Sequence, residues 1–107
     1  MKRLKFSSEL VPLVRSGEKT TTWRCFDEKG IKTGDELSLC NGEGVEFAVA
    51  DATAVKEVAF RDLTSEDRSG HDSYATDEEM YVAFTQFYGC PIGPETLVKI
   101  IHFTLRV

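Results

Sequence analysis

The clearest alternation of apolar and polar residues lies near the end of the chain. Every second residue from Ile101 to Val107 is apolar, and the residues between them are polar. A period of two is typical of a β-strand with one buried face, so the pattern predicts a strand over residues 96–107. The alternation slips at Ile100 and Ile101, which predicts either a β-bulge or burial on both faces of the sheet.

Three further stretches have the composition of strands. Residues 19–26 are rich in threonine and aromatic side chains, and residues 36–40 form a short, mostly apolar run. The sequence Asn-Gly-Glu-Gly at positions 41–44 predicts a hairpin turn. The stretch that follows it, residues 45–60, is long enough for one bent strand or for two.

Start and stop signals predict helices in three places. Residues 9–16 are predicted to form a short helix, which Gly17 can end in a left-handed conformation. Thr64 precedes acidic residues that favour a helix N-terminus, and Gly70 ends that helix quickly. Thr76 opens a longer helix whose apolar residues recur at helical spacing and indicate a stripe that faces the core: Met80, Phe84 and Phe87. Four or five strands with two or three short helices predict an α+β domain built on a small curled β-barrel.

Length and composition predict a single domain over residues 1–107. The chain is 41% apolar and 29% charged, which suits one ordinary core. No run of about 18 apolar residues occurs, and the basic N-terminus is not followed by the apolar stretch of a secretory signal. The chain has three widely spaced cysteines, Cys25, Cys40 and Cys90. Their odd number and spacing argue against a disulfide framework or a zinc knuckle. They favour thiols that act as small apolar side chains in a reducing cytoplasm.

The formal charge of −5 conceals an uneven distribution. Residues 1–34 hold eight of the 13 Lys and Arg residues and four of the 18 Asp and Glu residues, a local balance of +4. The rest of the chain is strongly acidic. This pattern favours a small basic patch, suited to one nucleotide or phosphate, over a surface that coats duplex DNA. Scattered solvated charge remains the alternative interpretation.

The segment from Ser16 to Arg24 concentrates the candidate chemistry. It contains a lysine, three threonines, an arginine and the only tryptophan of the chain. In an extended strand, Thr20, Thr22 and Arg24 share one face, so Lys19 can meet them only if the chain is still turning there. Burial and neighbouring positive charge would lower the pKa of such a lysine and make its amine a base or a nucleophile. A solvated lysine beside a threonine-rich strand is the plainer alternative.

The residues Gly-Glu-Lys-Thr-Thr-Thr-Trp-Arg at 17–24 resemble the Gly-x-Lys-Thr-x-Thr-x-Arg signature of the ASCH domain, a member of the PUA-like superfamily. The resemblance extends over the chain, through the Thr-Gly-Asp turn at 33–35, the stretch 60–64 before an acidic helix, and the closing strand 98–103. It implies a PUA-like β-barrel with helices across it. It also implies an association with RNA or modified nucleosides, and in one branch hydrolysis of the acetyl amide of N4-acetylcytidine.

In that hydrolytic branch, the resemblance implies a catalytic set of the signature lysine, its second threonine and a later glutamate. The first two correspond to Lys19 and Thr22. The position of the glutamate falls on His71, so this chain departs from the pattern there. Asp72 is the adjacent acid and Glu78 lies one element later, and we assign the role first to Asp72.

Two functions follow as hypotheses. An amidohydrolase would use Lys19 as nucleophile or general base, Thr22 to position or polarise the carbonyl, and an acid to protonate the leaving amine, with no metal or organic cofactor. A binding module would read a single RNA base in the same cleft by stacking it on an aromatic ring. The ligand would be a small nucleoside or nucleotide, or a short single-stranded RNA. The residues predicted to contact it are Thr20, Trp23, Arg24, His71 and Tyr74.

A metal site at His71 is not predicted. It would need further ligands, and the only other histidine, His102, lies far along the chain on a predicted strand.

Overall fold

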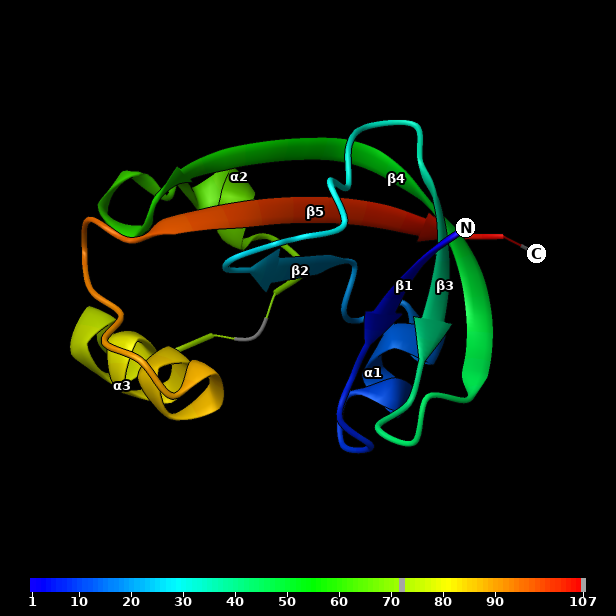
Figure 1. Ribbon diagram of the computed structural model, residues 1–107, viewed down its shortest axis with the longest axis horizontal. Helices are drawn as coiled ribbons and strands as arrows, with labels where there is room; N and C mark the ends of the chain where they lie inside the picture. The colour runs from blue at the N-terminus through cyan, green and yellow to red at the C-terminus, as the bar shows by residue number, and fades with distance from the viewer. Residues whose placement is uncertain (72, 107) are drawn as a thin grey trace.

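The computed structural model describes residues 1–71 and 73–106, and its core is a curled five-stranded sheet with helices packed against it (Figure 1). Over these residues no helix is long and apolar enough to cross a membrane. The strands are β1 (Lys2–Lys5), β2 (Thr21–Arg24), β3 (Glu36–Cys40), β4 (Glu46–Ala59) and β5 (Leu97–Leu105). The helices are α1 (Val11–Ser16), α2 (Ser65–Arg68) and α3 (Asp77–Tyr88), with a short 3₁₀ turn η1 (Phe60–Asp62).

The strand order is β1-β3-β4-β5-β2, in which β1 runs parallel to β3 and the other neighbours are antiparallel. The sheet curls so far that its two edge strands meet near one end. There the Arg24 guanidinium at the end of β2 donates a hydrogen bond of 2.8 Å to the carbonyl of Lys5 at the end of β1. The predicted α+β class and the curled barrel-like sheet are therefore confirmed.

The slip in the pattern at Ile100 and Ile101 reflects burial on both faces of β5. Both side chains are fully buried, Ile100 in one hydrophobic cluster and Ile101 in another. The register shift lies in the partner strand β4, between Ala52 and Ala54. β4 is one bent strand of 14 residues, so of the two predicted forms the single long strand is the correct one.

Two hydrophobic clusters pack on opposite sides of the β4–β5 ribbon. One lies inside the curl of the sheet, where Val14 of α1 packs among apolar residues of the strands. The other lies under α3, where Met80 and Phe84 pack against Trp23 and Phe60. Figure 1 shows α3 at one end of the molecule and α1 in the other half, beside β1 and β3. Each helix therefore covers its own cluster, and β2 contributes Trp23 to the cluster under α3.

The strand β1 is absent from the sequence prediction. Three of its four residues are basic, and only Leu4 in it is buried, so no alternation was available to identify it. The helix predicted over 9–16 begins only at Val11, and the strand predicted over 19–26 is reduced to Thr21–Arg24. The strand ends at Arg24, and two residues later Phe26 turns the chain with a φ of 56°.

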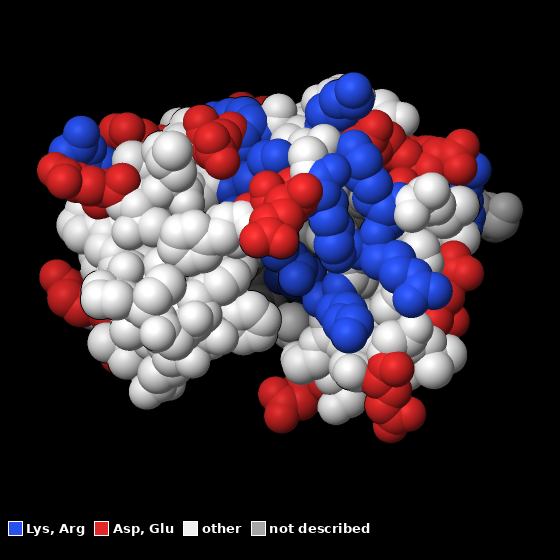
Figure 2. Space-filling view, in the orientation of Figure 1, with Lys and Arg blue, Asp and Glu red and all other residues white. Residues whose placement is uncertain are grey.

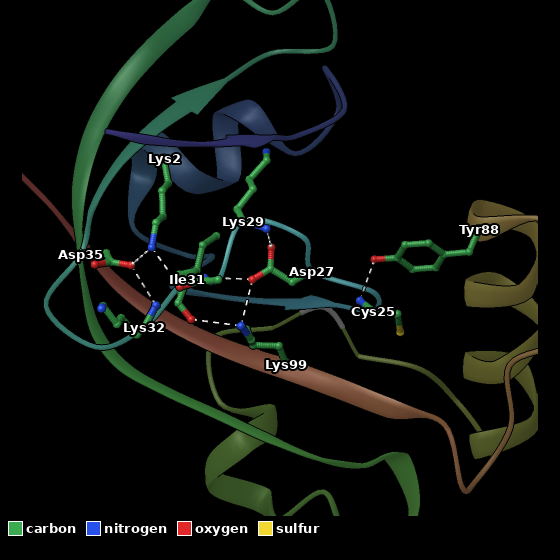
Figure 3. A network of polar contacts seen from close by, with 10 residues as sticks. Lys2, Cys25, Asp27, Lys29, Ile31, Lys32, Asp35, Tyr88 and Lys99 are labelled. Carbon is green, nitrogen blue, oxygen red and sulfur yellow. Dashed lines mark hydrogen bonds and ion pairs between the residues drawn. The ribbon is translucent and has the colours of Figure 1, made fainter.

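The loop between β2 and β3 is held by a network of polar contacts (Figure 3). The Asp27 carboxylate accepts hydrogen bonds from the amides of Lys29 and Ile31, both 3.0 Å, and from Lys99 Nζ at 2.9 Å. Burial alone would raise the pKa of Asp27, but these hydrogen bonds together lower it below its usual value. The carboxylate therefore anchors the loop beside the end of β2.

We expect Asp27→Asn to lower the free energy of unfolding at pH 7 by about 1.5–3 kcal/mol, the range for hydrogen bonds to a charged group. Because the pKa of Asp27 is lowered in the folded state, its contribution is present above its unfolded pKa of about 3.9 and is lost as the pH falls through the lower folded value. Urea unfolding at several pH values measures this. The two proteins should begin to converge below about pH 4, whereas the exposed Asp62→Asn control should match wild type throughout; a constant difference at all pH values would contradict the assignment.

Candidate functional site

A cavity of about 290 Å³ opens where the end of β1, the start of β2 and helix α3 approach one another. In Figure 2 the surface is hollowed between a group of Lys and Arg side chains and the largely uncharged surface over α3. The residues that line the cavity come from four segments: Lys5, Phe6, Ser7, Leu10, Lys19, Thr22, Trp23, Arg24, His71, Tyr74, Ala83, Phe84, Phe87 and Tyr88. One wall is therefore polar and basic, and the opposite wall is aromatic.

Lys19 reaches the cavity because the chain is still turning when it passes this residue. α1 ends at Gly17, which adopts a φ of 84°, and the Lys19 amide donates to the carbonyl of Leu13 at 3.0 Å. The regular strand begins only at Thr21. Lys19 therefore lines the same cavity as Thr22 and Arg24, although strict alternation would separate them. It is 4% exposed, an unusual environment for a lysine.

Thr22 and Arg24 follow at a spacing of two and so project from the same face of β2. The Arg24 Nε–H donates to Thr22 Oγ1 at 3.1 Å, and the guanidinium lies 5.1 Å from the centre of the Phe6 ring. Burial lowers the pKa of Arg24, while the nearby Tyr88 and Asp27 oppose that shift. A guanidinium remains charged despite such a shift, so the cavity wall carries a fixed positive group.

The segment 67–71, which includes the end of α2, is hydrogen-bonded to β2 along its length. The Gly70 carbonyl accepts from the amides of Thr20 and Thr21 at 2.9 and 3.2 Å, and the Thr21 hydroxyl donates to the Ser69 carbonyl at 2.7 Å. The indole N–H of Trp23 donates to the carbonyl of Asp67 at 3.2 Å. These contacts bring the segment to the cavity wall, where His71 stacks on Trp23 with ring centres 3.7 Å apart.

Gly70→Ala is expected to disrupt this contact between the segment and β2. Gly70 has a φ of +76°, and an added Cβ would overlap the hydroxyl of Thr20 and lie 3.2 Å from that of Thr21. Gly30 is a matched control, because its φ is +64° but an added Cβ meets nothing within 4 Å. Chemical denaturation should show a loss of about 1 kcal/mol for Gly30→Ala from backbone strain alone, and a clearly larger loss for Gly70→Ala. Equal losses would show that the close approach to β2 is unimportant.

The structure places most of the residues predicted from the sequence around this cavity. Lys19, Thr22, Arg24, His71 and Tyr74 all line it. Asp72 lies outside the described residues.

Of the other two residues predicted to contact the ligand, Thr20 lies outside the cavity and Trp23 lies in its wall. Thr20 is exposed and does not line the cavity, because its amide is bonded to Gly70 and the strand starts one residue later. Trp23 does line the cavity but is only 4% exposed. One face of its indole is covered by His71, so that face is not available for stacking a ligand.

The aromatic wall formed by Phe84, Phe87 and Tyr88 was not predicted from the sequence. Phe84 is buried, as predicted for a core residue. Phe87 was also predicted to face the core, but it is 74% exposed and lines the cavity, so that prediction was wrong. Tyr88 also lines the cavity, and its hydroxyl oxygen accepts a hydrogen bond from the Cys25 amide at 2.9 Å. The only available signal was the spacing of three and four residues from Phe84 to Phe87 and Tyr88, which places them along one side of a helix.

Exposed basic side chains lie in β1 and in the loop after β2. Lys5 lines the cavity and is exposed, and Arg3, Lys29 and Lys32 are exposed in these two segments. Figure 2 shows Lys and Arg side chains gathered beside the hollow. Among residues 1–71 and 73–106, no three His, Cys, Asp or Glu side chains are grouped closely enough to hold a metal ion.

Comparison with known proteins identifies the fold. No protein-family model matches the sequence, and no curated protein matches it. The structure resembles protein EF3133 of Enterococcus faecalis (family model DUF984), with a TM-score of 0.75, 21% identity, and coverage of 91% of this chain and 69% of that one. An ASCH domain from Lactobacillus crispatus matches with a TM-score of 0.65, 17% identity, and coverage of 88% and 68%. The hypothetical protein PH0355 matches with a TM-score of 0.74, 22% identity, and coverage of 99% and 100%.

These similarities define the class of structure: a small α+β domain with the ASCH fold. The match to an ASCH domain structure agrees with the resemblance carried by residues 17–24. At these levels of identity the agreement concerns the fold. What the cavity does must be argued from the residues that line it.

Proposed function

We propose that the protein is an amidohydrolase that removes the acyl group from the exocyclic amine of a pyrimidine nucleoside such as N4-acetylcytidine. The observation that carries this proposal is the buried Lys19 beside Thr22 and Arg24 in the wall of one cavity. At about 290 Å³ the cavity lies near the small end of the range for ligand pockets, about 300–1,000 Å³, which suits a nucleoside better than a longer ligand.

The two walls of the cavity suit the two parts of such a substrate. The aromatic wall of Phe84, Phe87 and Tyr88 offers apolar contact to a planar base. The wall formed by Lys19, Thr22 and Arg24 offers hydrogen-bond donors and positive charge to a carbonyl group. An acylated base bound between the walls would therefore place its acyl carbonyl against β2.

The reaction consumes one water molecule. The water oxygen bonds to the acyl carbon, and negative charge accumulates on the carbonyl oxygen as the tetrahedral intermediate forms. The bond from the acyl carbon to the exocyclic nitrogen then breaks, and that nitrogen takes a proton. Lys19 in its neutral form would accept a proton from water, and Thr22 would donate a hydrogen bond to the carbonyl oxygen. We assign delivery of the proton to the leaving amine to Asp72, from its position in the sequence.

The direct test is a steady-state assay with N4-acetylcytidine, in which the release of cytidine is followed with and without EDTA. We expect turnover by the wild-type protein at the same rate in both, since side chains act as the base, the hydrogen-bond donor and the acid in the proposed reaction. Loss of activity in EDTA that returns with added divalent metal would overturn the metal-free form of the proposal. No turnover under either condition would overturn the proposal itself.

The location of the site can be tested separately by filling the cavity from α3. Ala83 lines the cavity, whereas its neighbour Val82 is 55% exposed and is not part of the cavity wall. The larger side chain would occupy space that the substrate needs, so we expect Ala83→Phe to lower kcat/KM on N4-acetylcytidine at least tenfold. A tenfold loss corresponds to about 1.4 kcal/mol of binding free energy. Val82→Phe adds bulk on the outside and should leave kcat/KM unchanged. Equal values for the two variants would show that substrate binds elsewhere.

A non-catalytic module that binds single-stranded RNA is the second candidate function. The observation that favours it is that the exposed Lys5 and the exposed ring of Phe87 line the same cavity, because phosphates and unstacked bases are bound by such surfaces. Titration of a short single-stranded RNA at two salt concentrations distinguishes the candidates. An RNA-binding module with several phosphate contacts must lose affinity steeply as salt is raised. No binding at low salt would eliminate this candidate.

A further inference from the structure

Tyr88 reaches from helix α3 to the end of strand β2. It is the last residue of α3, and its side chain points toward Cys25, which directly follows β2 (Figure 3). The Cys25 amide donates a hydrogen bond of 2.9 Å to the phenolic oxygen. Tyr88 also lines the cavity. Its hydroxyl therefore lies where the aromatic wall of the cavity meets the end of β2.

The bond from Cys25 determines which role the hydroxyl of Tyr88 has left. A backbone amide can only donate, so the phenolic oxygen is the acceptor in this contact. The hydroxyl also carries one proton, and this bond does not use it. Within residues 1–71 and 73–106, no second hydrogen bond of this hydroxyl accompanies the one from Cys25. Burial raises the pKa of Tyr88, so the hydroxyl keeps its proton at neutral pH.

The ring of Tyr88 is held in place by three other aromatic rings. Phe84 lies 6.2 Å away and almost parallel to it, with an angle of 17° between the planes. Phe26 and Phe87 meet it edge-on, with ring centres 5.6 and 5.0 Å away. Since Cys25 also fixes the hydroxyl, the side chain has little freedom to move. The hydroxyl is therefore in place before any ligand binds, and a ligand in the cavity can accept its proton.

The hydroxyls of Tyr88 and Thr22 lie at different points along the direction of β2. Cys25, which binds Tyr88, follows Thr22 by three residues, about 10 Å at the rise of an extended strand. In the proposed complex the acyl group faces Lys19 and Thr22. The base extends from there toward Tyr88, because Tyr88 belongs to the aromatic wall that contacts it. On the edge of a pyrimidine that carries the acylated amine, the acceptor farthest from that amine is the carbonyl oxygen at C2.

We propose that Tyr88 is a specificity-determining residue whose hydroxyl donates a hydrogen bond to the C2 carbonyl oxygen of the pyrimidine. This inference rests on the proposed deacylation and deepens it, because it names the part of the base that is recognised. No bond of this carbonyl is made or broken in the reaction, so the contact is the same before and during hydrolysis. Such uniform binding lowers KM and leaves kcat unchanged. An acylated ring without this acceptor would leave the hydroxyl unpaired and bind less tightly.

A comparison of N4-acetylcytidine with N4-acetyl-2-thiocytidine tests the contact, because the two substrates differ only in the atom bonded to C2. Sulfur is a weak hydrogen-bond acceptor. We expect the wild-type protein to favour the oxygen substrate about three- to tenfold in kcat/KM, the effect of one neutral hydrogen bond, and mainly through KM. Tyr88→Phe should raise KM for N4-acetylcytidine by a similar factor and should no longer distinguish the two substrates.

Two comparisons separate recognition of the base from a structural role of Tyr88. Tyr88→Phe also removes the acceptor of the Cys25 amide, but a disturbance of the cavity would affect both substrates equally. Tyr81→Phe is the matched control: Tyr81 is half-buried in the same helix and its ring lies 5.9 Å from that of Phe60, but it does not line the cavity. This variant should keep the KM and the substrate preference of the wild-type protein.

Hydrolysis and base recognition can fail independently in this experiment. An active wild-type protein whose preference for oxygen disappears in Tyr88→Phe supports the contact. An active wild-type protein that has no preference, or keeps it in Tyr88→Phe, overturns the contact and leaves the hydrolysis standing. If Tyr88→Phe does not fold, the wild-type preference alone decides: its presence supports the contact, and equal kcat/KM values overturn it.

An inactive wild-type protein overturns the hydrolysis. Base recognition is then decided by the Kd values of cytidine and 2-thiocytidine, measured by NMR titration of the wild-type protein and Tyr88→Phe. Tighter binding of cytidine that depends on Tyr88 supports the contact. Equal Kd values in the wild-type protein, or no binding of cytidine, overturn it.

Discussion

Replacing Lys19 with alanine is expected to remove the hydrolysis of N4-acetylcytidine. Lys19 is 4% exposed and lines the cavity beside Thr22, so its amine is held where bulk water and free amines cannot substitute for it. Positioned groups of this kind correspond to effective concentrations of about 10⁵ M or more, so we expect kcat/KM to fall at least 1,000-fold. Rates measured with wild type and Lys19→Ala under identical conditions check this.

Lys5→Ala is the matched control for this change. Lys5 lines the same cavity but is exposed, so its loss changes the local charge without removing a buried amine. We expect at most a few-fold change for an exposed charge of this kind. A Lys19→Ala protein that folds normally and keeps more than a tenth of the activity would refute the role assigned to the lysine.

The second large effect is expected at Asp72. The glutamate of the hydrolytic branch that residues 17–24 resemble would fall at His71, and His71 lies in the cavity wall stacked on Trp23. Its neighbour in sequence is therefore the first candidate for the acid that protonates the leaving amine. Losing such a group costs on the order of 100- to 10,000-fold, and we expect Asp72→Asn to lower kcat/KM by that amount.

Glu78→Gln provides the comparison for Asp72→Asn. Glu78 is exposed in the first turn of α3, where acidic residues favour the helix N-terminus, and it does not line the cavity. Its replacement should change the rate little. Full activity in Asp72→Asn together with a large loss in Glu78→Gln would reverse the assignment of the acid.

The parts of the fold that could be predicted from the sequence are those set by local signals. Gly17 ends α1 and Gly89 ends α3, both in left-handed conformations, and Thr76 begins α3 by accepting a hydrogen bond from the Glu79 amide. The strand β3 has the predicted limits of Glu36–Cys40. Such signals act within a few residues, so they are visible without knowledge of the tertiary structure.

What the sequence did not predict depends on contacts between distant segments. β1 is short and mostly basic, and it is a strand because it pairs with β3 more than thirty residues away. The Arg24 contacts with Lys5 and Phe6 close the sheet and exist only once that pairing is formed. For this reason the sequence predicted that Arg24 contacts the ligand but contained no indication of its hydrogen bond to the carbonyl of Lys5.

In the candidate site, too, some features follow from local sequence signals and others depend on contacts between distant segments. The signature at 17–24 was enough to predict that Lys19, Thr22 and Arg24 belong together. Their common cavity depends on the turn at Lys19 and on the segment 67–71, which is bonded to β2 across almost fifty residues of chain. Thr20 was assigned to the site by its position in the signature, and that position lies just outside the strand.

The proposed role of Lys19 in hydrolysing an acylated nucleoside is tested most directly by product analysis with proton NMR. Wild-type protein and Lys19→Ala are each incubated with N4-acetylcytidine, and the amounts of cytidine and acetate are measured over time. We expect equimolar cytidine and acetate from the wild-type protein and neither product above background from Lys19→Ala. An unchanged substrate with the wild-type protein, or equal product from both proteins, would contradict the claim that this cavity hydrolyses an acylated nucleoside with Lys19.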